Sequence, residues 1–373
     1  MGAAVLLLSG SISFDAAARA VDYRTIVFLF GMMIVVANLR LAGFFRLVTA
    51  SALSWANSPR QVLAAMVFVP GFLAAFFIND VVCLVCTPLV LQITRQRGLP
   101  PVPYLLALAT AANIGSVATV SGNPQNMLLA SFGQVPYSTF AFRLSPLALA
   151  GLILDYAILS FVFRRELETP LSPSPLHLPR RVHRVLLYKS TFAALLTVGL
   201  FFAGLPVAEV SLGVAAWLLA TRRVRPEKVY REIDWPLLVM FAGLFVVVAA
   251  VEHAGLDVWL LRYWNTMEQW GPGGLMLVTA LLSNVVGNVP AVMILKPAVV
   301  QSADPIGSAL LLAAVSTFAG NFLTTGSVAN FIVLEQARRA GVTITLWDYA
   351  RAGIPIALAT LLLTLVAFSS VYR

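Results

Sequence analysis

Two polar, glycine-containing stretches interrupt segments that are otherwise apolar and long enough to cross a membrane. They are Thr119-Val-Ser-Gly-Asn-Pro-Gln-Asn126 and Leu323-Thr-Thr-Gly-Ser-Val-Ala-Asn330. Two further apolar segments are broken by asparagine, at Ile78-Asn79-Asp80 and at Ser283-Asn284. Unwound backbone at membrane depth is tolerated only where protein buries it or where it lines a watery cavity. Four such breaks, paired across the two halves of the chain, predict a binding site near the bilayer midplane.

Apart from Asp80, the polar side chains at these breaks are hydrogen-bond donors without a full charge. Asparagine amides, serine and threonine hydroxyls and helix N-terminal N–H groups suit an anion or an oxyacid. The predicted substrate-binding residues are Asn79, Ser121, Asn123, Ser283, Asn284, Thr325 and Ser327. For any single residue the alternative is a hydrogen bond between helices. The four breaks taken together favour a site.

Glycine at a break permits positive φ and a close approach of backbone, so that neighbouring carbonyl oxygens are available to a cation. The predicted cation-binding or coupling residues are Asn79, Asp80, Gly122, Asn126, Asn284, Gly326 and Asn330. The coupling ion is H⁺ or Na⁺. No organic cofactor and no metal other than Na⁺ is expected.

Asp80 is the acid placed most clearly at a break. A carboxylate at membrane depth costs at least roughly 2.5 kcal/mol on insertion scales, and such residues are functional candidates by default. Asp80 is a candidate to ligate Na⁺ or to carry a proton. The alternative is that it caps the helix that follows it. Asp155 and Glu335 are weaker candidates for the same role.

The elements that must position these residues are membrane-spanning helices. Of the 373 residues, 60% are hydrophobic and only 11% are charged, against about 25% charged in soluble domains. A spanning helix needs roughly 20 apolar residues. The candidate spans are Arg24–Asn38, Tyr104–Val120, Phe140–Phe163, Leu186–Ala203, Val207–Ala220, Trp235–Val251 and Gly353–Ser369. The net charge of +9 does not indicate nucleic acid, because the basic residues lie in short loops between spans.

The two halves of the chain resemble each other. Asp22–Gly43 aligns with Asp234–Gly255, and the four landmarks Asn79, Gly122, Asn126 and Pro146 meet Asn284, Gly326, Asn330 and Pro355 in the same order. If the second half is inverted in the membrane, most of the 25 Lys and Arg residues fall on one side, as the positive-inside rule requires of the cytoplasmic side. The prediction is an all-α polytopic membrane protein with two inverted-topology repeats, each with a re-entrant hairpin and a broken transmembrane helix.

The repeats have predicted bounds. The first covers residues 1–165, with a hairpin over 60–94 and a broken helix over 104–130. A cytoplasmic linker over 166–185 follows. The second repeat covers 186–373, with a hairpin over 273–297 and a broken helix over 308–336. The stretches 43–58 and 255–269 are predicted to lie along the membrane interface.

At these motifs the chain resembles the ion transporter superfamily, which includes divalent anion:sodium symporters, citrate-transporter-like permeases and arsenite permeases. The segments that carry the resemblance are 76–88, 113–126, 282–290 and 319–330. The resemblance implies two inverted repeats, a scaffold that commonly dimerises and a transport domain that moves. In the symporter branch a Ser-Asn-Thr triplet occupies each hairpin tip. Here the triplets read Ile78-Asn79-Asp80 and Ser283-Asn284-Val285, so three of the four hydroxyls are absent.

The sequence therefore predicts a secondary active transporter that moves a small anion or oxyacid, either a carboxylate or an inorganic oxyanion, coupled to H⁺ or Na⁺ by alternating access. The alternative is a cation/proton antiporter of the same fold. An enzyme is not predicted, because Cys83 and Cys86 have no second ligand pair and the three histidines lie near predicted surfaces. The expected partners are the substrate, the lipid bilayer and a second copy of the chain. The expected location is the plasma (inner) membrane of a prokaryote.

Overall fold

The computed structural model describes residues 2–171, 183–221, 224–255 and 271–369. Throughout these ranges the chain is helical and contains no strand. Five of the described helices are long and apolar enough to cross a membrane: Tyr23–Ala42, Pro59–Phe76, Tyr137–Val162, Arg184–Phe202 and Leu346–Ser369. The prediction of an all-α polytopic membrane protein is confirmed.

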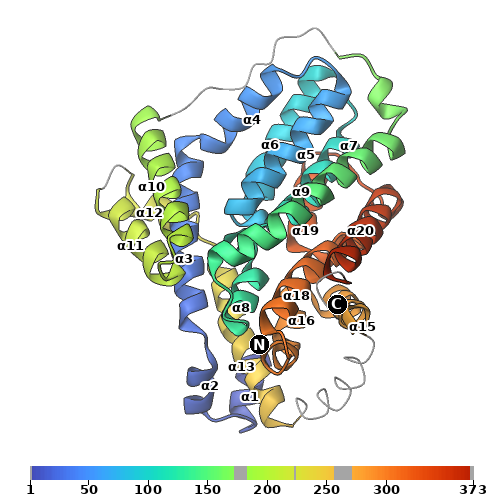
Figure 1. The fold of residues 1–373 in the computed structure, drawn as a ribbon. Helices are drawn as coiled ribbons and strands as arrows, with labels where there is room; N and C mark the ends of the chain where they lie inside the picture. Colours follow the sequence, from blue (N-terminus) through green and yellow to red (C-terminus); the bar gives the residue numbers. More distant parts are fainter. Residues whose placement is uncertain (1, 172–182, 222–223, 256–270, 370–373) are drawn as a thin grey trace.

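The helices follow one another as the hydropathy pattern predicts (Figure 1). The first half contains α1 (Gly2–Leu8), α2 (Phe14–Ala20), α3 (Tyr23–Ala42), α4 (Phe44–Ser54), α5 (Pro59–Phe76), α6 (Asn79–Arg97), α7 (Pro101–Ser116), η1 (Val120–Gly122), α8 (Pro124–Phe132), α9 (Tyr137–Val162) and η2 (Glu166–Glu168). The second half contains α10 (Arg184–Phe202), α11 (Val207–Ala220), α12 (Pro226–Tyr230), α13 (Trp235–His253), α15 (Gly271–Val286), α16 (Asn288–Ile294), α17 (Lys296–Val300), α18 (Pro305–Ala319), η3 (Thr324–Gly326), α19 (Val328–Arg339) and α20 (Leu346–Ser369).

The helices form two groups that pack more closely within themselves than against each other. In the first group α3 packs along α10 and α11, and α13 contacts α1, α2 and α3. In the second group α5 packs along α7, α6 along α19, and α9 against both α7 and α20. The same group includes α18, which packs against α8, α15 and α20, and α16, which packs against α8 and α15. Figure 1 shows α3, α10 and α11 on the left and the second group to the right. We call these the α3 group and the α7 group.

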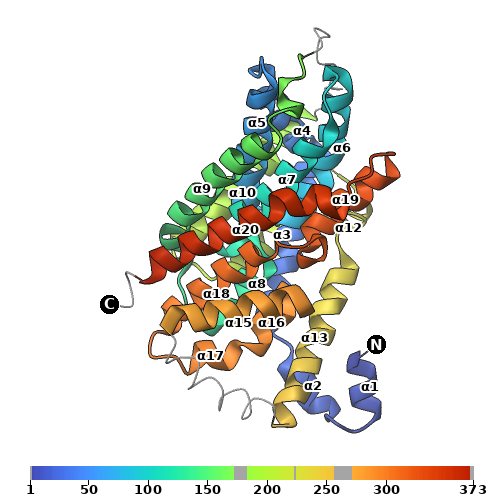
Figure 2. The same cartoon turned by 90° about the vertical axis from the view of Figure 1, so that its right-hand side faces the viewer.

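The first hairpin has the predicted form. Helix α5 begins at Pro59, where the Ser58 hydroxyl caps it by accepting a hydrogen bond from the Gln61 N–H. It ends at Phe76, and α6 begins at Asn79 after a tip of two residues. Figures 1 and 2 place this hairpin toward one end of the molecule, and α15, α16 and α17 toward the other. The hairpins therefore enter from opposite ends.

The second hairpin turns at a different residue from the one predicted. Asn284 lies inside the last turn of α15, which continues to Val286. The tip is Gly287, whose φ of 92° is a conformation that favours glycine. Asn288 is the first residue of the returning helix, as Asn79 is in the first hairpin. Asn288, not Asn284, is thus the structural counterpart of Asn79, and the pairing predicted from the sequence is wrong at this point.

The two broken helices are held by one shared arrangement. Asn126 Nδ2 donates to the carbonyl oxygens of Ser116 and Thr119, both at 2.9 Å. Asn330 Nδ2 donates to those of Gly320 and Leu323, at 2.9 and 3.3 Å. In each half, the asparagine after the break binds the backbone before it. These bonds satisfy carbonyl groups that the broken helix leaves without intrahelical partners.

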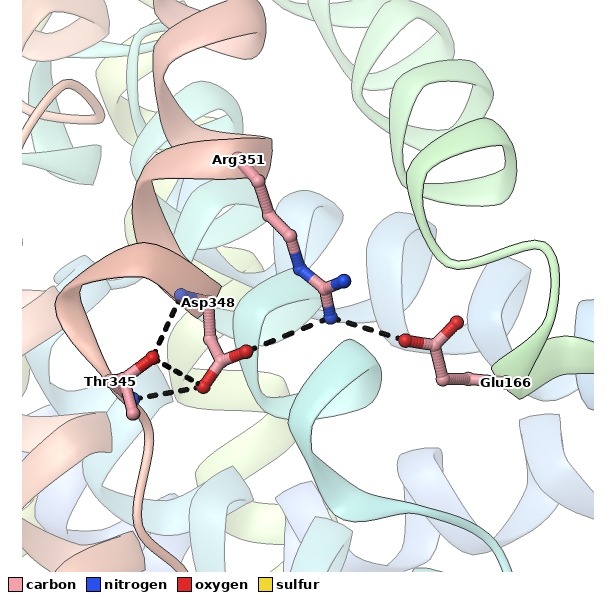
Figure 3. A network of polar contacts seen from close by, with 4 residues as sticks. All are labelled: Glu166, Thr345, Asp348 and Arg351. Atoms are coloured by element: carbon pink, nitrogen blue, oxygen red, sulfur yellow. Dashed lines mark hydrogen bonds and ion pairs between the residues drawn. The ribbon is translucent and has the colours of Figure 1, made fainter.

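At one end of the α7 group a polar network joins the two halves of the chain (Figure 3). Arg351 Nη2 on α20 lies 3.1 Å from Glu166 Oε1 of η2 and 3.7 Å from Asp348 Oδ1. The Arg351 guanidinium also lies over the Phe163 ring, 4.3 Å from its centroid. Thr345 and Asp348 cap the start of α20 reciprocally: Thr345 N–H donates to Asp348 Oδ2 at 3.1 Å, and Asp348 N–H to Thr345 Oγ1 at 3.0 Å. The end of α9 is thereby fixed to the start of α20.

Of the two predicted interfacial stretches, residues 43–58 contain helix α4, and most of 255–269 lies outside the described residues. The exact bounds of the two repeats and of the linker remain predictions.

Candidate functional site

A cavity of about 220 Å³ lies where the two hairpin tips and the two broken helices meet. The α7 group supplies its polar side, and α13 of the α3 group closes it with an apolar wall of Leu237, Met240, Phe241 and Leu244. The remaining lining residues are Asn79, Asp80, Asn123, Pro124, Gln125, Val286, Gly287, Asn288, Val289, Pro290, Thr325, Gly326, Ser327 and Val328. This volume suits a small ligand, since pockets for drug-sized molecules begin near 300 Å³.

Four helices begin at the cavity. Helices α6, α8, α16 and α19 start at Asn79, Pro124, Asn288 and Val328, and all four residues line it. The N-terminal N–H groups of a helix carry partial positive charge and favour an electronegative ligand. The sequence supports the starts locally: Pro124 fits the first turn of α8, and the Ser327 hydroxyl caps α19 by accepting from the Ala329 N–H. The breaks therefore direct several helix starts at one point.

Asn113 of α7 is the centre of a buried cluster of amides behind the cavity. Its Nδ2 donates to Asn321 Oδ1 at 2.8 Å and to Asn330 Oδ1 at 3.0 Å. Its Oδ1 accepts from Asn79 Nδ2 at 3.1 Å and from Ser327 Oγ at 2.8 Å. Two cavity-lining residues from different halves of the chain, Asn79 and Ser327, are thus oriented by one side chain.

That orientation leaves Asn79 with a free acceptor. Its Oδ1 is buried and has no hydrogen-bond partner among the described residues. Buried polar atoms are almost always hydrogen-bonded, so an unpartnered acceptor on a residue that lines a cavity is suited to a ligand donor, such as a hydroxyl group. Asn79 thus lines the cavity, and its role in substrate binding stays a prediction.

Two further residues that line the cavity, Asn288 and Gln125, are joined by a hydrogen bond. In the orientation of the Asn288 amide that satisfies its neighbours, Nδ2 donates to the carbonyl oxygens of Gly326 and Ser316, both at 3.1 Å, and Oδ1 accepts from Gln125 Nε2 at 3.2 Å. Gln125 Nε2 also donates to Thr317 Oγ1 at 3.0 Å. The carbonyl of Gly326, predicted as a possible cation ligand, is therefore already a hydrogen-bond acceptor.

The two break glycines are required for close packing rather than for positive φ. Neither has a positive φ among the described glycines. A Cβ on Gly326 would lie 2.7 Å from the carbonyl oxygen of Gly320 and 3.0 Å from Asn284 Oδ1. A Cβ on Gly122 would collide with the carbonyl oxygen of Ser116 and lie 2.8 Å from that of Ala74. The prediction of close backbone approach is right at both positions, and the prediction of positive φ is wrong.

Asp80 borders two cavities. It lines the 220 Å³ cavity, in which it is the only acid among the lining residues that the structure describes. It also lines a second cavity of about 60 Å³ at the boundary between the two helix groups, together with Arg40, Glu232 and Asp234. The side chain of Ile78, the residue before α6, makes no capping hydrogen bond. Both interpretations of Asp80, coupling residue and helix cap, stay predictions.

The predicted site residues divide into those at the cavity and those behind it. Asn79, Asp80, Asn123, Thr325, Gly326 and Ser327 line the cavity. Asn126 and Asn330 lie behind the cavity and bind the backbone before each break. Ser121 is not a lining residue, and its hydroxyl lies 3.0 Å from both Thr119 Oγ1 and Tyr137 OH. Ser283 Oγ donates to the carbonyl oxygen of Ser316 at 3.0 Å. Asn284 Nδ2 donates to those of Ala280 and Ala319, and Asn284 borders a separate apolar groove of about 560 Å³.

Sequence reasoning missed four polar residues of this region: Asn113, Gln125, Asn288 and Asn321. Asn113 and Gln125 lie within the motif that contains the first break, and Asn321 lies in the corresponding second motif. Their polarity inside apolar segments was the available signal. Asn288 follows Gly287 directly, and a glycine beside an asparagine at a hairpin tip was the signal for its place.

The chain is similar to known transporters over most of its length. A family model described as "Citrate transporter" matches residues 1–319. The chain is 31% identical to the silicon efflux transporter LSI3 of Oryza sativa subsp. japonica, with 98% of this chain and 90% of that protein covered. It is 25% identical to the arsenical pump membrane protein of Escherichia coli, with 88% and 82% covered.

A solved structure has a similar fold. The YdaH transporter of Alcanivorax borkumensis superimposes with a TM-score of 0.61 at 17% sequence identity, and the match covers 98% of this chain and 87% of that one. At this identity the likeness concerns the fold alone.

Proposed function

Because the chain belongs to the citrate transporter family, we propose that it is a secondary transporter that exports a small uncharged oxyacid in exchange for protons. The family and the named relatives establish three broader points. The protein is a transporter rather than an enzyme, it lies in the membrane with several spans, and it moves a small molecule. The bacterial relatives agree with a plasma-membrane location. The resemblance inferred from the four motifs is also confirmed.

The observation that carries the proposal is the chemical character of the 220 Å³ cavity. Among the lining residues that the structure describes, the polar side chains are amides, hydroxyls and the single carboxylate of Asp80, and none is basic. A multiply charged anion would face this carboxylate without a cationic partner, and burying an unpaired charge is costly. An uncharged acid with several hydroxyl groups offers donors to Asn79 Oδ1 and to Asp80, and acceptor oxygens to the amides and helix starts.

The direction of transport and the substrate class are supported by two relatives, a silicon efflux transporter and an arsenical pump membrane protein. Silicic and arsenous acids are uncharged at neutral pH and carry several hydroxyl groups, so both fit the lining. A tricarboxylate such as citrate fits it less well, despite the family name, because the cavity offers it no basic side chain.

Alternating access is supported by the position of the cavity at the boundary of the two helix groups. The α7 group carries both hairpins, both breaks and all the polar lining, whereas α13 of the α3 group presents an apolar wall. Movement of the α7 group along this wall would carry the ligand without breaking hydrogen bonds to the scaffold. The protein is proposed to act as a homodimer, as the family resemblance implies.

Proteoliposome flux tests this function. Vesicles with purified protein are loaded with silicic acid, arsenous acid, citrate, sulfate or phosphate, and pH and Na⁺ gradients are imposed separately. The proposal predicts that a pH gradient drives the uncharged acids and that Asn79→Ala abolishes this flux. Citrate movement driven by Na⁺, with no movement of the uncharged acids, would refute it.

The same assay distinguishes the second candidate, a cation/proton antiporter. Asp80 together with Asp234 and Glu232 around the 60 Å³ cavity is the observation that favours it. Such an antiporter would dissipate a pH gradient on addition of Na⁺ or K⁺ with no oxyacid present.

A further inference from the structure

Asp155 carries a carboxyl group in the interior of the α7 group and is not among the residues that line the cavity. It lies on the membrane-spanning helix α9 and is fully buried. Its Oδ2 atom has no hydrogen-bond partner among the described residues. Acids inside membrane segments are expensive and are by default functional candidates.

The hydrogen bonds around Asp155 fit only one protonation state well. Thr110 Oγ1 lies 2.9 Å from Asp155 Oδ1 and 2.9 Å from the carbonyl oxygen of Leu106. A hydroxyl has one hydrogen, and both a carboxylate and a carbonyl only accept. If Asp155 is ionised, the two acceptors compete for that hydrogen. If Asp155 is protonated, its O–H donates to Thr110 Oγ1, and Thr110 donates to Leu106.

No described cation offsets a charge at Asp155. Helices α5, α7, α10, α18 and α20 pack against α9. Tyr349 of α20, whose hydroxyl accepts from Asn330 Nδ2 at 2.7 Å, is the titratable group that faces it. Arg351 of the same helix is paired with Glu166, and Lys189 of α10 donates to the carbonyl oxygen of Leu218. The other charged or titratable groups on these helices lie at or near the helix starts or on α10: Arg60, Tyr104, Arg184, Tyr188 and Asp348. An ionised Asp155 would be an uncompensated buried charge.

The fold does not need an acid at this place. Helices α9 and α20 occupy corresponding positions in the two halves, and each contains an internal proline, Pro146 and Pro355. Counted from these prolines, Thr364 takes the place of Asp155. The Thr364 hydroxyl donates to the carbonyl oxygen of Thr360 at 2.8 Å and is fully buried. At the equivalent position of the second half, the neutral hydroxyl of Thr364 is sufficient for packing. The acid Asp155 in the first half therefore needs an explanation other than packing.

Asp155 is connected to the cavity through hydrogen bonds. It binds the Thr110 hydroxyl, and the Thr110 carbonyl oxygen accepts from Asn321 Nδ2 at 3.4 Å. Asn321 Oδ1 accepts from Asn113, which in turn accepts from the cavity-lining Asn79. We propose that Asp155 is a proton-binding site, occupied in the conformation described here, and that a ligand in the cavity changes its proton affinity through this chain. The effect of a ligand on Asp155 rests on the proposed oxyacid transport, whereas the protonation of Asp155 does not.

Infrared spectroscopy of the purified protein in lipid tests the protonation directly. A carboxylic acid has a carbonyl band that a carboxylate lacks, and exchange into D₂O shifts it. The difference between wild type and Asp155→Asn is expected to contain such a band at neutral pH. Thr110→Val should shift its frequency, because one hydrogen bond is lost. Asp22→Asn is the matched control: the Asp22 oxygens accept from Arg24 N, Thr25 N and Thr25 Oγ1, so neither oxygen lacks a donor, and this variant should not remove the band.

The coupling is tested in the same samples. Addition of silicic or arsenous acid is expected to change the intensity or position of the Asp155 band, and Asp155→Asn should lose flux driven by a pH gradient while substrate exchange continues. Absence of an Asp155 acid band at neutral pH overturns the whole inference. A band that ligand leaves unchanged, with gradient-driven flux intact in Asp155→Asn, overturns the coupling. If neither acid is transported by wild type but the band is present, the proposed function fails and the proton site stands.

Discussion

Asn113 Nδ2 donates to Asn330 Oδ1 at 3.0 Å, and this contact joins the first broken helix to the second at the level of their breaks. Asn330 in turn binds the carbonyl oxygens that precede its own break. The geometry of one break is therefore transmitted to the other through two side chains. A cavity lined from both halves requires such a connection, because each half supplies only part of the polar lining.

We expect Asn113→Ala to destabilise the protein and to abolish transport. Four side-chain hydrogen bonds are lost, and at about 0.6 kcal/mol each in a membrane interior the loss is roughly 2 kcal/mol. Thermal unfolding in detergent measures the stability, and flux measures the function. Asn38→Ala is the matched control, because Asn38 is a buried asparagine of α3 that donates only within its own helix, to Ile34. Equal effects of the two variants would contradict the central role of Asn113.

Gly326→Ala should lower the yield of folded protein. The added methyl group meets backbone at 2.7 Å, where relief by a side-chain movement is not available, and overpacking of this kind costs about 1–3 kcal/mol. Gly213→Ala serves as the control, since nothing lies within 4 Å of a Cβ at Gly213 in α11. Size-exclusion profiles and melting curves of the two variants provide the comparison. A stable Gly326→Ala protein would show that the backbone at the break adapts.

Replacement of either hairpin asparagine at the cavity should stop transport. Asn79→Ala removes an acceptor that has no protein partner, and Asn288→Ala releases Gln125 and the Gly326 carbonyl. Asn284→Ala is expected to act through stability instead, because Asn284 binds backbone and borders the apolar groove. Binding of radiolabelled arsenous acid to folded protein separates these effects. Normal binding in the Asn79 and Asn288 variants would show that both residues only stabilise the structure through hydrogen bonds.

Asp80→Asn should lose gradient-driven accumulation and keep substrate exchange. Asparagine preserves shape and hydrogen bonding but neither exchanges a proton nor supplies a full charge to Na⁺. Driven transport near the wild-type level would remove Asp80 from the coupling step. In that case the coupling role would pass to carbonyl groups around Gly122 and Gly326, and Na⁺ would be favoured over H⁺.

Asp234, one of the two acids that line the 60 Å³ cavity with Asp80, provides a related test within the same experiment. Asp234 caps α13 by accepting from the Leu237 N–H at 3.0 Å, and asparagine caps about equally well. Asp234→Asn is therefore expected to keep the fold and to change gradient-driven transport, because it removes a carboxyl group from the cavity that Asp80 also lines. Asp22→Asn removes the corresponding cap acid of α3, which does not line that cavity, and should leave gradient-driven transport unchanged.

The inverted arrangement of the two halves predicts which loops face each side of the membrane. In a background without Cys83 and Cys86, a cysteine at Ser302 should be labelled from outside. A cysteine at Ser174, which lies outside the described residues and is chosen from the sequence, should be labelled from the cytoplasm. Labelling of both from one side would contradict the inverted repeats.

Much of the cavity could be predicted from local sequence. Asn79, Asp80, Asn123 and Ser327 stand out because polar residues and glycine inside membrane-length apolar segments are costly unless they serve a purpose. The order of the breaks in the two halves also follows from local pattern. These features depend on residues that are close together in the sequence, so the sequence alone determines them.

Only the tertiary structure decided which polar residues meet. Asn284 and Asn288 are both plausible hairpin residues in the sequence, and the positive φ at Gly287 places the turn so that Asn288 faces the cavity. In the sequence Asn113 is only one polar residue in an apolar segment, and its central role appears when Asn79, Asn321 and Ser327 are brought to its amide. The sequence favours Asp80 over Asp155 as the coupling residue. The burial of Asp155 and its unpartnered oxygen result from packing, which the sequence does not show. Contacts between residues distant in the chain leave no local periodicity, and that is why the sequence could not determine them.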